Sequence, residues 1–304
     1  MKRLEFHITY ICNHACIFCS EDERMRKYNK NPLSPIQVKI ILIDRARKWF
    51  NHVNFTGGEP TLFPGFIDLL IFAKKLWYII YVWTNGTKFI EPEFSREALK
   101  YIDELSLSVH WYDNESCIEQ TGDALHFQNF QKIIDNINSY KTSKNLFFSN
   151  IVINRSNYKN ALAIVTFLRD TGYPLHQILI SVIAPEGTAD RNFWDLVFDL
   201  SDFQEDIPEI IQYTNTHWII LRFFGLPTCI LWDQYKDYAN DEHWEERHTI
   251  ERFSNTDGKV KLIDIYTPDN SRKRTFVEKC ENCKWRMKPC TWVFKKYLDY
   301  YDFR

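Results

Sequence analysis

The sequence predicts an α/β protein in which six strand–helix units form an open, partial (β/α)6 barrel, followed by a small C-terminal α+β unit. Strand-like and helix-like segments alternate over the first two-thirds of the chain, a pattern typical of βαβ units with a parallel sheet. The regular alternation ends near residue 190, and the later chain carries a compact group of cysteines. We therefore expect a barrel domain over residues 1–216 and a smaller domain over residues 217–304.

The predicted strands of the barrel are short runs rich in apolar residues, at 3–10, 52–56, 78–84, 104–110, 146–154 and 177–184. The segments between them have the amphipathic pattern of helices, at about 35–50, 64–76, 93–102, 125–139 and 157–171. The less regular remainder has a helical pattern near 192–212 and strand patterns at 218–224 and 259–266. We expect these two later strands to belong to a small hairpin in the C-terminal unit, with irregular structure over 231–257.

The fourth predicted strand separates its side chains by polarity. Leu105 and Leu107 alternate with Ser106 and Ser108, and successive side chains of a strand point to opposite faces. The apolar face would pack on helices, and the polar face would line a cavity that holds a polar ligand. An edge strand with one solvated face is the alternative interpretation.

The bulk composition is that of an ordinary globular protein. The 304 residues are 45% hydrophobic and 26% charged, with a net charge of −2. This charge gives no reason to expect a nucleic acid or an anionic membrane as partner. No apolar run reaches the 18 residues of a transmembrane helix. Because the first predicted strand begins at residue 3, we expect no signal peptide, no N-terminal peptide-recognition domain and a cytoplasmic location.

Seven of the eight cysteines fall into two groups with the spacing of metal ligands. Cys12, Cys16 and Cys19 have the spacing C-x3-C-x2-C, which suits a [4Fe–4S] cluster but provides ligands for three of its irons. The fourth iron would then be open to a ligand that is not protein. A disulfide framework is less fitting for a long chain without a secretory signal.

The second group consists of Cys229, Cys280, Cys283 and Cys290, with Cys280-x2-Cys283-x6-Cys290 as its compact part. Four thiolates also complete a tetrahedral zinc site, which is the alternative to a cluster. Cys117 belongs to neither group. The two groups together indicate two metal centres in a reducing compartment.

Residues Gly57, Gly58, Glu59 and Pro60 follow the second predicted strand. Adjacent glycines allow the backbone to approach a ligand closely and to adopt positive φ. Backbone carbonyls and a carboxylate together suit an ammonium group. A simple strand-to-helix turn is the alternative.

The three-cysteine spacing, followed some forty residues later by Gly-Gly-Glu-Pro, resembles the radical S-adenosylmethionine (SAM) superfamily over residues 3–190. The aromatic Phe18 before Cys19 and the segment Thr84-Asn-Gly add to the resemblance. It implies a TIM-like partial barrel in which SAM binds the open iron. One electron from the cluster would cleave the sulfonium and yield a 5′-deoxyadenosyl radical, which takes a hydrogen atom from the substrate.

The resemblance also implies roles for single residues. Cys12, Cys16 and Cys19 would ligate the cluster. Phe18 would lie against the adenine of SAM. The SAM amino group would be held by Gly57, Gly58 and Glu59. The SAM carboxylate or ribose would be contacted by Thr84, Ser108 and Asn154.

The C-terminal cysteines resemble the SPASM/twitch extensions of radical SAM enzymes, which hold auxiliary [4Fe–4S] clusters. Four cysteines match the one-cluster twitch form, so the resemblance implies two clusters in total. With four ligands no iron of the auxiliary cluster is free for substrate, which favours electron transfer or structural support. Cys117 lies in the expected loop after the fourth strand, where a thiol could return a hydrogen atom to a substrate radical. A small buried hydrophobe is the more common role of a lone cysteine.

These implications predict a radical SAM enzyme that oxidises or cross-links its substrate and takes electrons from a donor such as flavodoxin or ferredoxin. A ribosomally made peptide is the favoured substrate, although the expected lack of a recognition domain weakens this choice. A small molecule such as a sugar, nucleotide or cofactor precursor is the alternative. A further alternative is a non-catalytic Fe–S or zinc protein. The predicted ammonium-binding turn argues against it, because such a protein would not need this turn.

Overall fold

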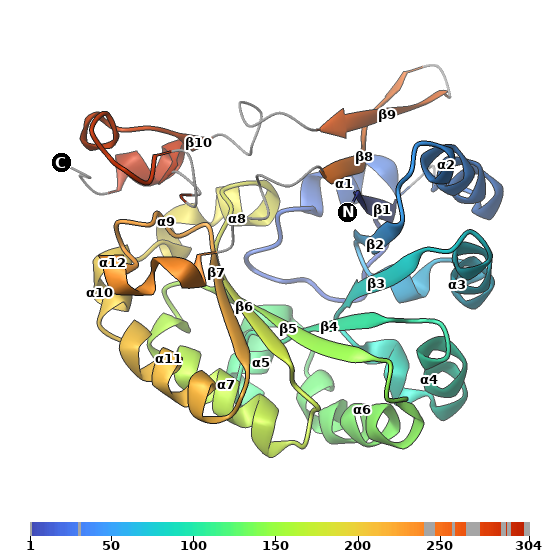
Figure 1. Cartoon of the computed structure of the whole chain (residues 1–304), viewed down its shortest axis with the longest axis horizontal. Helices are drawn as coiled ribbons and strands as arrows, with labels where there is room; N and C mark the ends of the chain where they lie inside the picture. Colours follow the sequence, from blue (N-terminus) through green and yellow to red (C-terminus); the bar gives the residue numbers. More distant parts are fainter. Residues whose placement is uncertain are drawn as a thin grey trace.

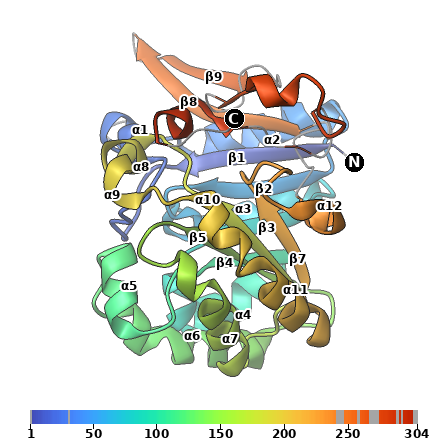
Figure 2. The ribbon, with the colours of Figure 1, turned by 90° about the vertical axis from the view of Figure 1, so that its left-hand side faces the viewer.

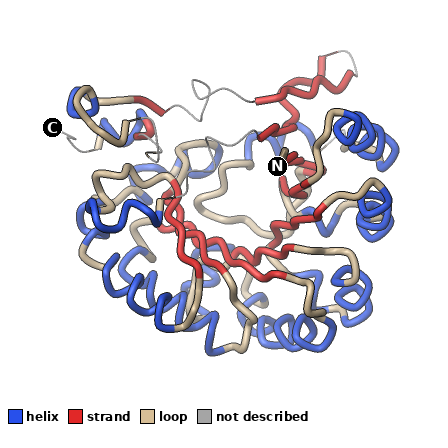
Figure 3. Tube along the Cα trace, in the orientation of Figure 1, coloured by secondary structure: helices blue, strands red, loops and turns tan. Residues whose placement is uncertain are grey.

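The computed structural model describes residues 2–29, 32–239, 247–256, 259–265, 274–286, 290 and 293–300. Its centre is a curved sheet that forms an open arc, with helices along the outer side (Figures 1 and 3). The strands of this sheet are β1 (Arg3–Thr9), β2 (His52–Gly57), β3 (Ile79–Thr84), β4 (Glu104–Ser108), β5 (Leu146–Ile153), β6 (Gln177–Val182), β7 (Ile220–Phe224), β8 (Arg247–Thr256) and β9 (Lys259–Ile265).

The order of the strands is β7-β6-β5-β4-β3-β2-β1-β8-β9. Strands β1 to β7 are parallel to their neighbours, β8 is parallel to β1, and β9 is antiparallel to β8. Seven parallel strands joined through helices confirm the predicted partial barrel. Each of the six predicted barrel strands coincides with an observed one to within two residues at either end.

The helices on the outer side of the arc are α2 (Pro35–Arg47), α3 (Phe66–Lys75), α4 (Pro92–Leu99), α6 (His126–Tyr140), α7 (Ala161–Asp170) and α11 (Ile207–Thr216). The first five coincide with the predicted helices. Local chemistry sets their ends: Ser34 forms a capping box with Gln37, and Pro35 occupies the first turn of α2, where its missing N–H has no intrahelical partner to lose.

The shorter helices were less well predicted. They are α1 (Asp22–Tyr28), α5 (Asn114–Thr121), α8 (Gly187–Arg191), α9 (Phe193–Leu196), α10 (Leu200–Gln204) and α12 (Trp232–Tyr235). The single helix expected near 192–212 is divided into α9, α10 and α11. Val197 is extended after α9, and Asp199 caps α10 by accepting a hydrogen bond from Ser201 N, so the chain restarts rather than continuing one helix.

The alternation of side chains in β4 positions polar groups inside the arc. Leu105 and Leu107 are fully buried in the hydrophobic core on one face of the strand. Ser106 lies on the opposite face and is also buried, at 2% exposure. Because β4 lies between β3 and β5, it is not an edge strand. The register puts Asn150 of β5 opposite Ser108, and Asn150 accepts a hydrogen bond from Ser181 of β6. The inner face of the barrel therefore carries the predicted polar groups, next to apolar side chains such as Phe148 and Leu179.

The strand predicted at 218–224 has a different partner from the one expected. As β7 it follows α11 and pairs in parallel with β6, because the segment from β6 to β7 is one more strand–helix–strand unit. The hairpin partner of β9 is instead β8, within a region expected to be irregular. The barrel sheet thus extends beyond residue 216, while the division into two domains stays a prediction.

The C-terminal segment lies near α8 and β7, at one edge of the open arc of strands (Figures 1 and 2). Its strands β10 (Arg274–Thr275) and β11 (Val293–Phe294) form a separate antiparallel pair. The Tyr297 hydroxyl donates to the carbonyl of Ile183 at 3.1 Å, and the Lys296 ammonium lies 2.7 Å from the Asp190 carboxylate. Across the described part of the chain, no helix has the length and apolarity needed to cross a membrane.

Candidate active site

The three predicted ligand cysteines lie on the loop of residues 11–20, here called the three-cysteine loop, at the carboxyl end of β1. Its backbone is held by distant segments of the chain. Ala15 N donates to Thr121 O at 2.8 Å. The loop in turn accepts at Ile11 O from Glu59 N at 2.7 Å and at Cys19 O from Thr188 N at 2.8 Å. Hydrogen bonds from three other regions thus fix the path of the loop before any cofactor binds.

The three thiols lie near one another in a largely buried environment. Burial raises the pKa of Cys12 to about 11 and that of Cys19 to about 12. The pKa of Cys16 is also raised, first by burial and then by the neighbouring Cys19 and Cys12 thiols. Metal coordination would replace these protons.

The paired glycines bring the turn after β2 against the start of the three-cysteine loop. A Cβ atom on Gly57 would lie 2.2 Å from Thr9 O, and one on Gly58 would lie 2.4 Å from Ile11 O. Gly57 also has a φ of +120°. The close approach that requires glycine is thus first of all an approach to the protein's own backbone.

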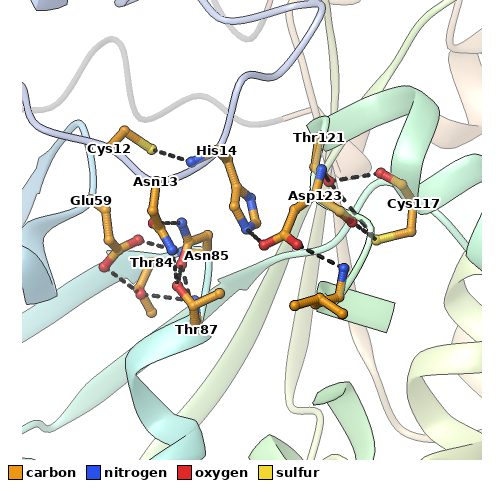
Figure 4. Close-up of polar contacts among 12 residues, drawn as sticks. Cys12, Asn13, His14, Glu59, Thr84, Asn85, Thr87, Cys117, Thr121 and Asp123 are labelled. Atoms are coloured by element: carbon orange, nitrogen blue, oxygen red, sulfur yellow. Dashed lines mark hydrogen bonds and ion pairs between the residues drawn. The ribbon is translucent and has the colours of Figure 1, made fainter. Parts of the chain in front are cut away.

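The Glu59 carboxylate joins this turn to the end of β3 (Figure 4). It is 1% exposed. Its Oε1 accepts from the amide and hydroxyl of Thr61 at 3.0 and 2.6 Å and from Thr84 Oγ1 at 2.7 Å. Its Oε2 accepts from Asn85 N at 2.7 Å. Among the residues that the structure describes, Oε2 has this one hydrogen bond, and it keeps capacity to accept from a ligand ammonium group.

The pKa of the Glu59 carboxyl is raised by burial, and its hydrogen bonds oppose this shift. Its charge in turn contributes to the raised pKa of the Cys12 thiol. The predicted ammonium-binding turn and the first cysteine are therefore neighbours in space.

A second polar link between the loop and β3 was not predicted. Asn85 Nδ2 donates to Asn13 Oδ1 at 2.8 Å, and Asn13 Nδ2 donates to Thr87 Oγ1 at 2.8 Å (Figure 4). Asn13 follows the first cysteine directly, and Asn85 lies in the Thr84-Asn-Gly segment. The signal in the sequence was the presence of these two asparagines inside motifs already singled out.

The other residues predicted to contact SAM lie around this centre in different roles. Phe18, at 8% exposure, packs edge-on against His110 with ring centroids 4.6 Å apart. Thr84 donates to Glu59, as described above. Ser108 ends β4 and is partly exposed on the polar face of the barrel.

Asn154 is fully buried, and its side chain is already engaged. It donates to Gln120 Oε1 at 2.7 Å and accepts from the backbone and hydroxyl of Ser156 at 3.0 and 2.9 Å. Gln120 O in turn accepts from Ile17 N of the three-cysteine loop. In this geometry Asn154 supports the loop from behind, and its contact with SAM stays a prediction.

Cys117 does not lie in a loop, as was expected, but in α5. The segment after β4 begins a helix because Asp113 caps it, accepting from Ser116 N at 2.8 Å. The Cys117 side chain is fully buried, 3.9 Å from Thr121 Oγ1, and burial raises its pKa to about 11. This environment is that of a core residue, and the role as hydrogen donor stays an untested prediction.

The four C-terminal cysteines come from segments far apart in the sequence. Cys229 follows β7 and is exposed, whereas Cys290 is buried. Although Cys229 is exposed as a residue, nearby protein atoms partly desolvate its thiol and, with the Cys290 and Cys280 thiols, raise its pKa, so these three groups are neighbours. Cys283 is joined to Cys280 by a backbone hydrogen bond of 3.2 Å.

Comparison with known proteins decides the family. The family model described as the radical SAM superfamily matches residues 6–168, more than half of the chain. The protein is a member of the radical SAM superfamily. Membership implies SAM and one [4Fe–4S] cluster, and the three partly buried, neighbouring cysteines beside the Glu59 turn fit that cluster.

Individual relatives and structures refine the comparison. A protein of Saccharolobus islandicus (strain Y.N.15.51) named "Probable GTP 3′,8-cyclase" is 26% identical over 277 residues, covering 89% of this chain and 84% of the relative. An "S-adenosylmethionine-dependent nucleotide dehydratase" of Lacinutrix mariniflava is 28% identical over 169 residues, 53% of this chain and 34% of that protein. The crystal structure of Streptococcus suis SuiB bound to SAM superposes with a TM-score of 0.66 at 17% identity, over 93% of this chain and 71% of SuiB. At that identity, the SuiB match supports the fold.

Proposed function

We propose that this protein reductively cleaves SAM to a 5′-deoxyadenosyl radical, which removes a hydrogen atom from a polar small molecule of the nucleotide class. The observation that carries the proposal is the contact between the three-cysteine loop and the Glu59 turn, joined by the 2.7 Å hydrogen bond from Glu59 N to Ile11 O. A scaffold protein would not need a buried carboxylate beside an incompletely ligated cluster.

The chain's own residues would divide the work as follows. Cys12, Cys16 and Cys19 hold the cluster, which supplies the electron for cleavage when it is bound. Glu59 places a buried negative charge beside it, where the SAM amino group would be attracted. Asn13 and Asn85 fix the distance between the loop and that charge. Buried, prearranged groups of this kind hold a ligand in position without reorganising.

A second [4Fe–4S] cluster at Cys229, Cys280, Cys283 and Cys290 is part of the proposal. Its support is the proximity of three of these thiols, since the Cys290 and Cys280 thiols both contribute to the raised pKa of Cys229. Four ligands leave no open iron, so the cluster would accept an electron from the substrate radical or stabilise the C-terminal segment. An electron-transfer role would make the overall reaction an oxidation.

The nucleotide class is preferred to a peptide for two reasons. The similarity to a protein named as a GTP cyclase covers most of both chains, and the inner face of the barrel carries the polar residues Ser106, Asn150 and Ser181 among apolar ones. The peptide predicted from the sequence is the second candidate, because SuiB, a structural neighbour with a TM-score of 0.58 in its complex with precursor peptide SuiA, has this fold.

The test is anaerobic reconstitution followed by iron counting and product analysis. Two clusters predict about eight irons per chain, and reduction should release 5′-deoxyadenosine. The nucleoside triphosphates, each deuterated on its ribose, are then supplied in turn. Transfer of one deuterium into 5′-deoxyadenosine identifies the substrate, and absence of transfer from every nucleotide would reject the nucleotide class.

A further inference from the structure

A group of two histidines and one aspartate lies behind the three-cysteine loop, on the side away from Glu59. Each of these residues, His14, Asp123 and His126, has one potential metal-ligand atom, and the three atoms lie within 4.8 Å of one another. His14 Nε2 is 3.4 Å from Asp123 Oδ2, and the His14 and His126 rings meet edge-on with centroids 4.7 Å apart. Figure 4 shows His14 and Asp123 pointing toward each other.

His126 has no partner that would account for its burial. It is 1% exposed, and within the described residues neither of its ring nitrogens makes a hydrogen bond. Trp111 and Phe130 pack against it, with ring centroids 5.4 and 5.9 Å away. A buried polar atom without a partner is unfavourable. We therefore expect a bound ligand to interact with these nitrogens.

The other two groups are held in place to share such a ligand. The His14 side chain is 3% exposed, and its Nε2 also lacks a hydrogen bond. Asp123 Oδ1 accepts from Leu125 N at 2.8 Å, which orients the carboxylate and leaves Oδ2 toward His14. A carboxylate fixed by a backbone donor in this way is typical of metal ligands.

We propose that His14, Asp123 and His126 bind a divalent transition-metal ion, with Zn²⁺ as the ion to test. Two imidazoles and one carboxylate suit zinc or ferrous iron, whereas Mg²⁺ and Ca²⁺ prefer oxygen ligands. Ligand bonds of about 2.0–2.2 Å in tetrahedral geometry put ligand atoms about 3.4 Å apart, as found for His14 Nε2 and Asp123 Oδ2. Water would complete the shell.

This ion would join the three-cysteine loop to the connection between α5 and α6. The loop is already attached there, since Ala15 N donates to Thr121 O and Ala15 packs against Gly122. The metal would extend that attachment to His14, midway between the first two cysteines. It is a structural ion distinct from both clusters, and the inference does not depend on the substrate.

The experiment uses the full-length protein with its clusters reconstituted, so that cysteines are not free to capture zinc. After removal of loosely bound metal and equilibration with Zn²⁺, elemental analysis and zinc X-ray absorption are measured. We expect about one zinc per chain with a shell of nitrogen and oxygen at about 2.0–2.1 Å rather than sulfur at about 2.3 Å.

The variants Asp123→Asn and His126→Gln should each weaken zinc affinity on the order of 100-fold, at least as much as substitutions around a metal site usually do. His217→Gln is the matched control, because His217 contacts Tyr213 O at the end of α11 and should leave zinc unchanged. Asp123 has 24% of its side chain exposed, so we expect it to tolerate substitution best. If His126→Gln fails to fold, the zinc affinity of Asp123→Asn alone tests the proposal. A sulfur shell, no retained zinc, or unchanged affinity in Asp123→Asn would overturn the proposal.

Discussion

The two cysteine groups differ in how the fold holds them. Cys12, Cys16 and Cys19 share one loop, whose backbone is fixed to the turn after β2, to the end of α5 and to the start of α8. The C-terminal group brings Cys229 together with Cys280 across fifty residues of chain, beside strands of only two residues. The first site is therefore prearranged by the barrel, while the second depends on the docking of a separate segment.

The largest effect that would test this contrast comes from removing each group of thiols. Replacing Cys12, Cys16 and Cys19 by alanine should abolish SAM cleavage and reduce the iron from about eight to about four per chain. Replacing Cys280 and Cys283 should remove the other irons but leave 5′-deoxyadenosine formation measurable. Iron analysis and chromatography give both quantities. Loss of SAM cleavage in the second variant would show that the two sites are not independent.

A second test concerns the backbone contact that prearranges the first site. In Gly58→Ala the new Cβ would meet Ile11 O at 2.4 Å and Tyr10 C at 2.8 Å, and neither backbone atom can move without displacing the three-cysteine loop. We expect SAM cleavage to fall on the order of 100-fold, since small displacements of reacting groups have effects of that size.

The matched control for this test is Gly65→Ala, in a turn where the nearest atom to the new Cβ is 3.9 Å away. Its φ of +72° would lower the free energy of unfolding by about 1 kcal/mol with cleavage retained. Equal cleavage rates in the two variants would argue against a role for the Gly58 contact.

A third test uses pH. Burial lowers the pKa of His110 to about 3, whereas a histidine in the unfolded chain has a pKa of about 6.5. The unfolded state therefore takes up the proton first as the pH falls. The contribution of His110 to the free energy of unfolding is complete well above pH 6.5 and begins to decrease near that pH. Its slope approaches about 1.4 kcal/mol per pH unit below about pH 5.5 and levels off as the pH nears the folded pKa.

We therefore expect the unfolding free energy to drop by about 1 kcal/mol more in the unaltered protein than in His110→Asn between pH 6.5 and 5.5. Urea titrations at the two pH values measure the difference. Asparagine keeps an acceptor for Val152 N, which donates to His110 Nδ1 at 2.9 Å. Parallel pH dependence in both proteins would mean that the imidazole is not held neutral next to Phe18.

The smallest effect is expected for Cys117→Ala. The thiol is a fully buried part of the core, so its removal should lower the free energy of unfolding by about 1 kcal/mol. SAM cleavage and substrate turnover per folded molecule should be unchanged. Product loss with SAM cleavage intact would instead identify Cys117 as the hydrogen donor.

The elements of the barrel were predictable because each depends on local periodicity and end signals. The alternation of Leu105 and Ser106 defined a two-faced strand, and the amphipathic pattern at about 35–50 located a helix. The same reasoning failed for β7, since a strand pattern does not reveal its neighbour. It also failed for α5. Asp113 caps the start of this helix, whereas Cys117 was expected in a loop.

At the candidate site, the spacing of Cys12, Cys16 and Cys19 by itself was enough to predict the ligands of the barrel site, because residues three or four apart on one loop can reach a common centre whatever surrounds them. What Gly58, Glu59 and Asn154 do was decided only by the tertiary structure: a close backbone contact, a carboxylate bound by four donors and a buried support. Likewise, only folding brings His14 of the loop beside Asp123 and His126. Hydrogen bonds and steric contacts between distant segments depend on how the chain folds back on itself, and no local pattern records that.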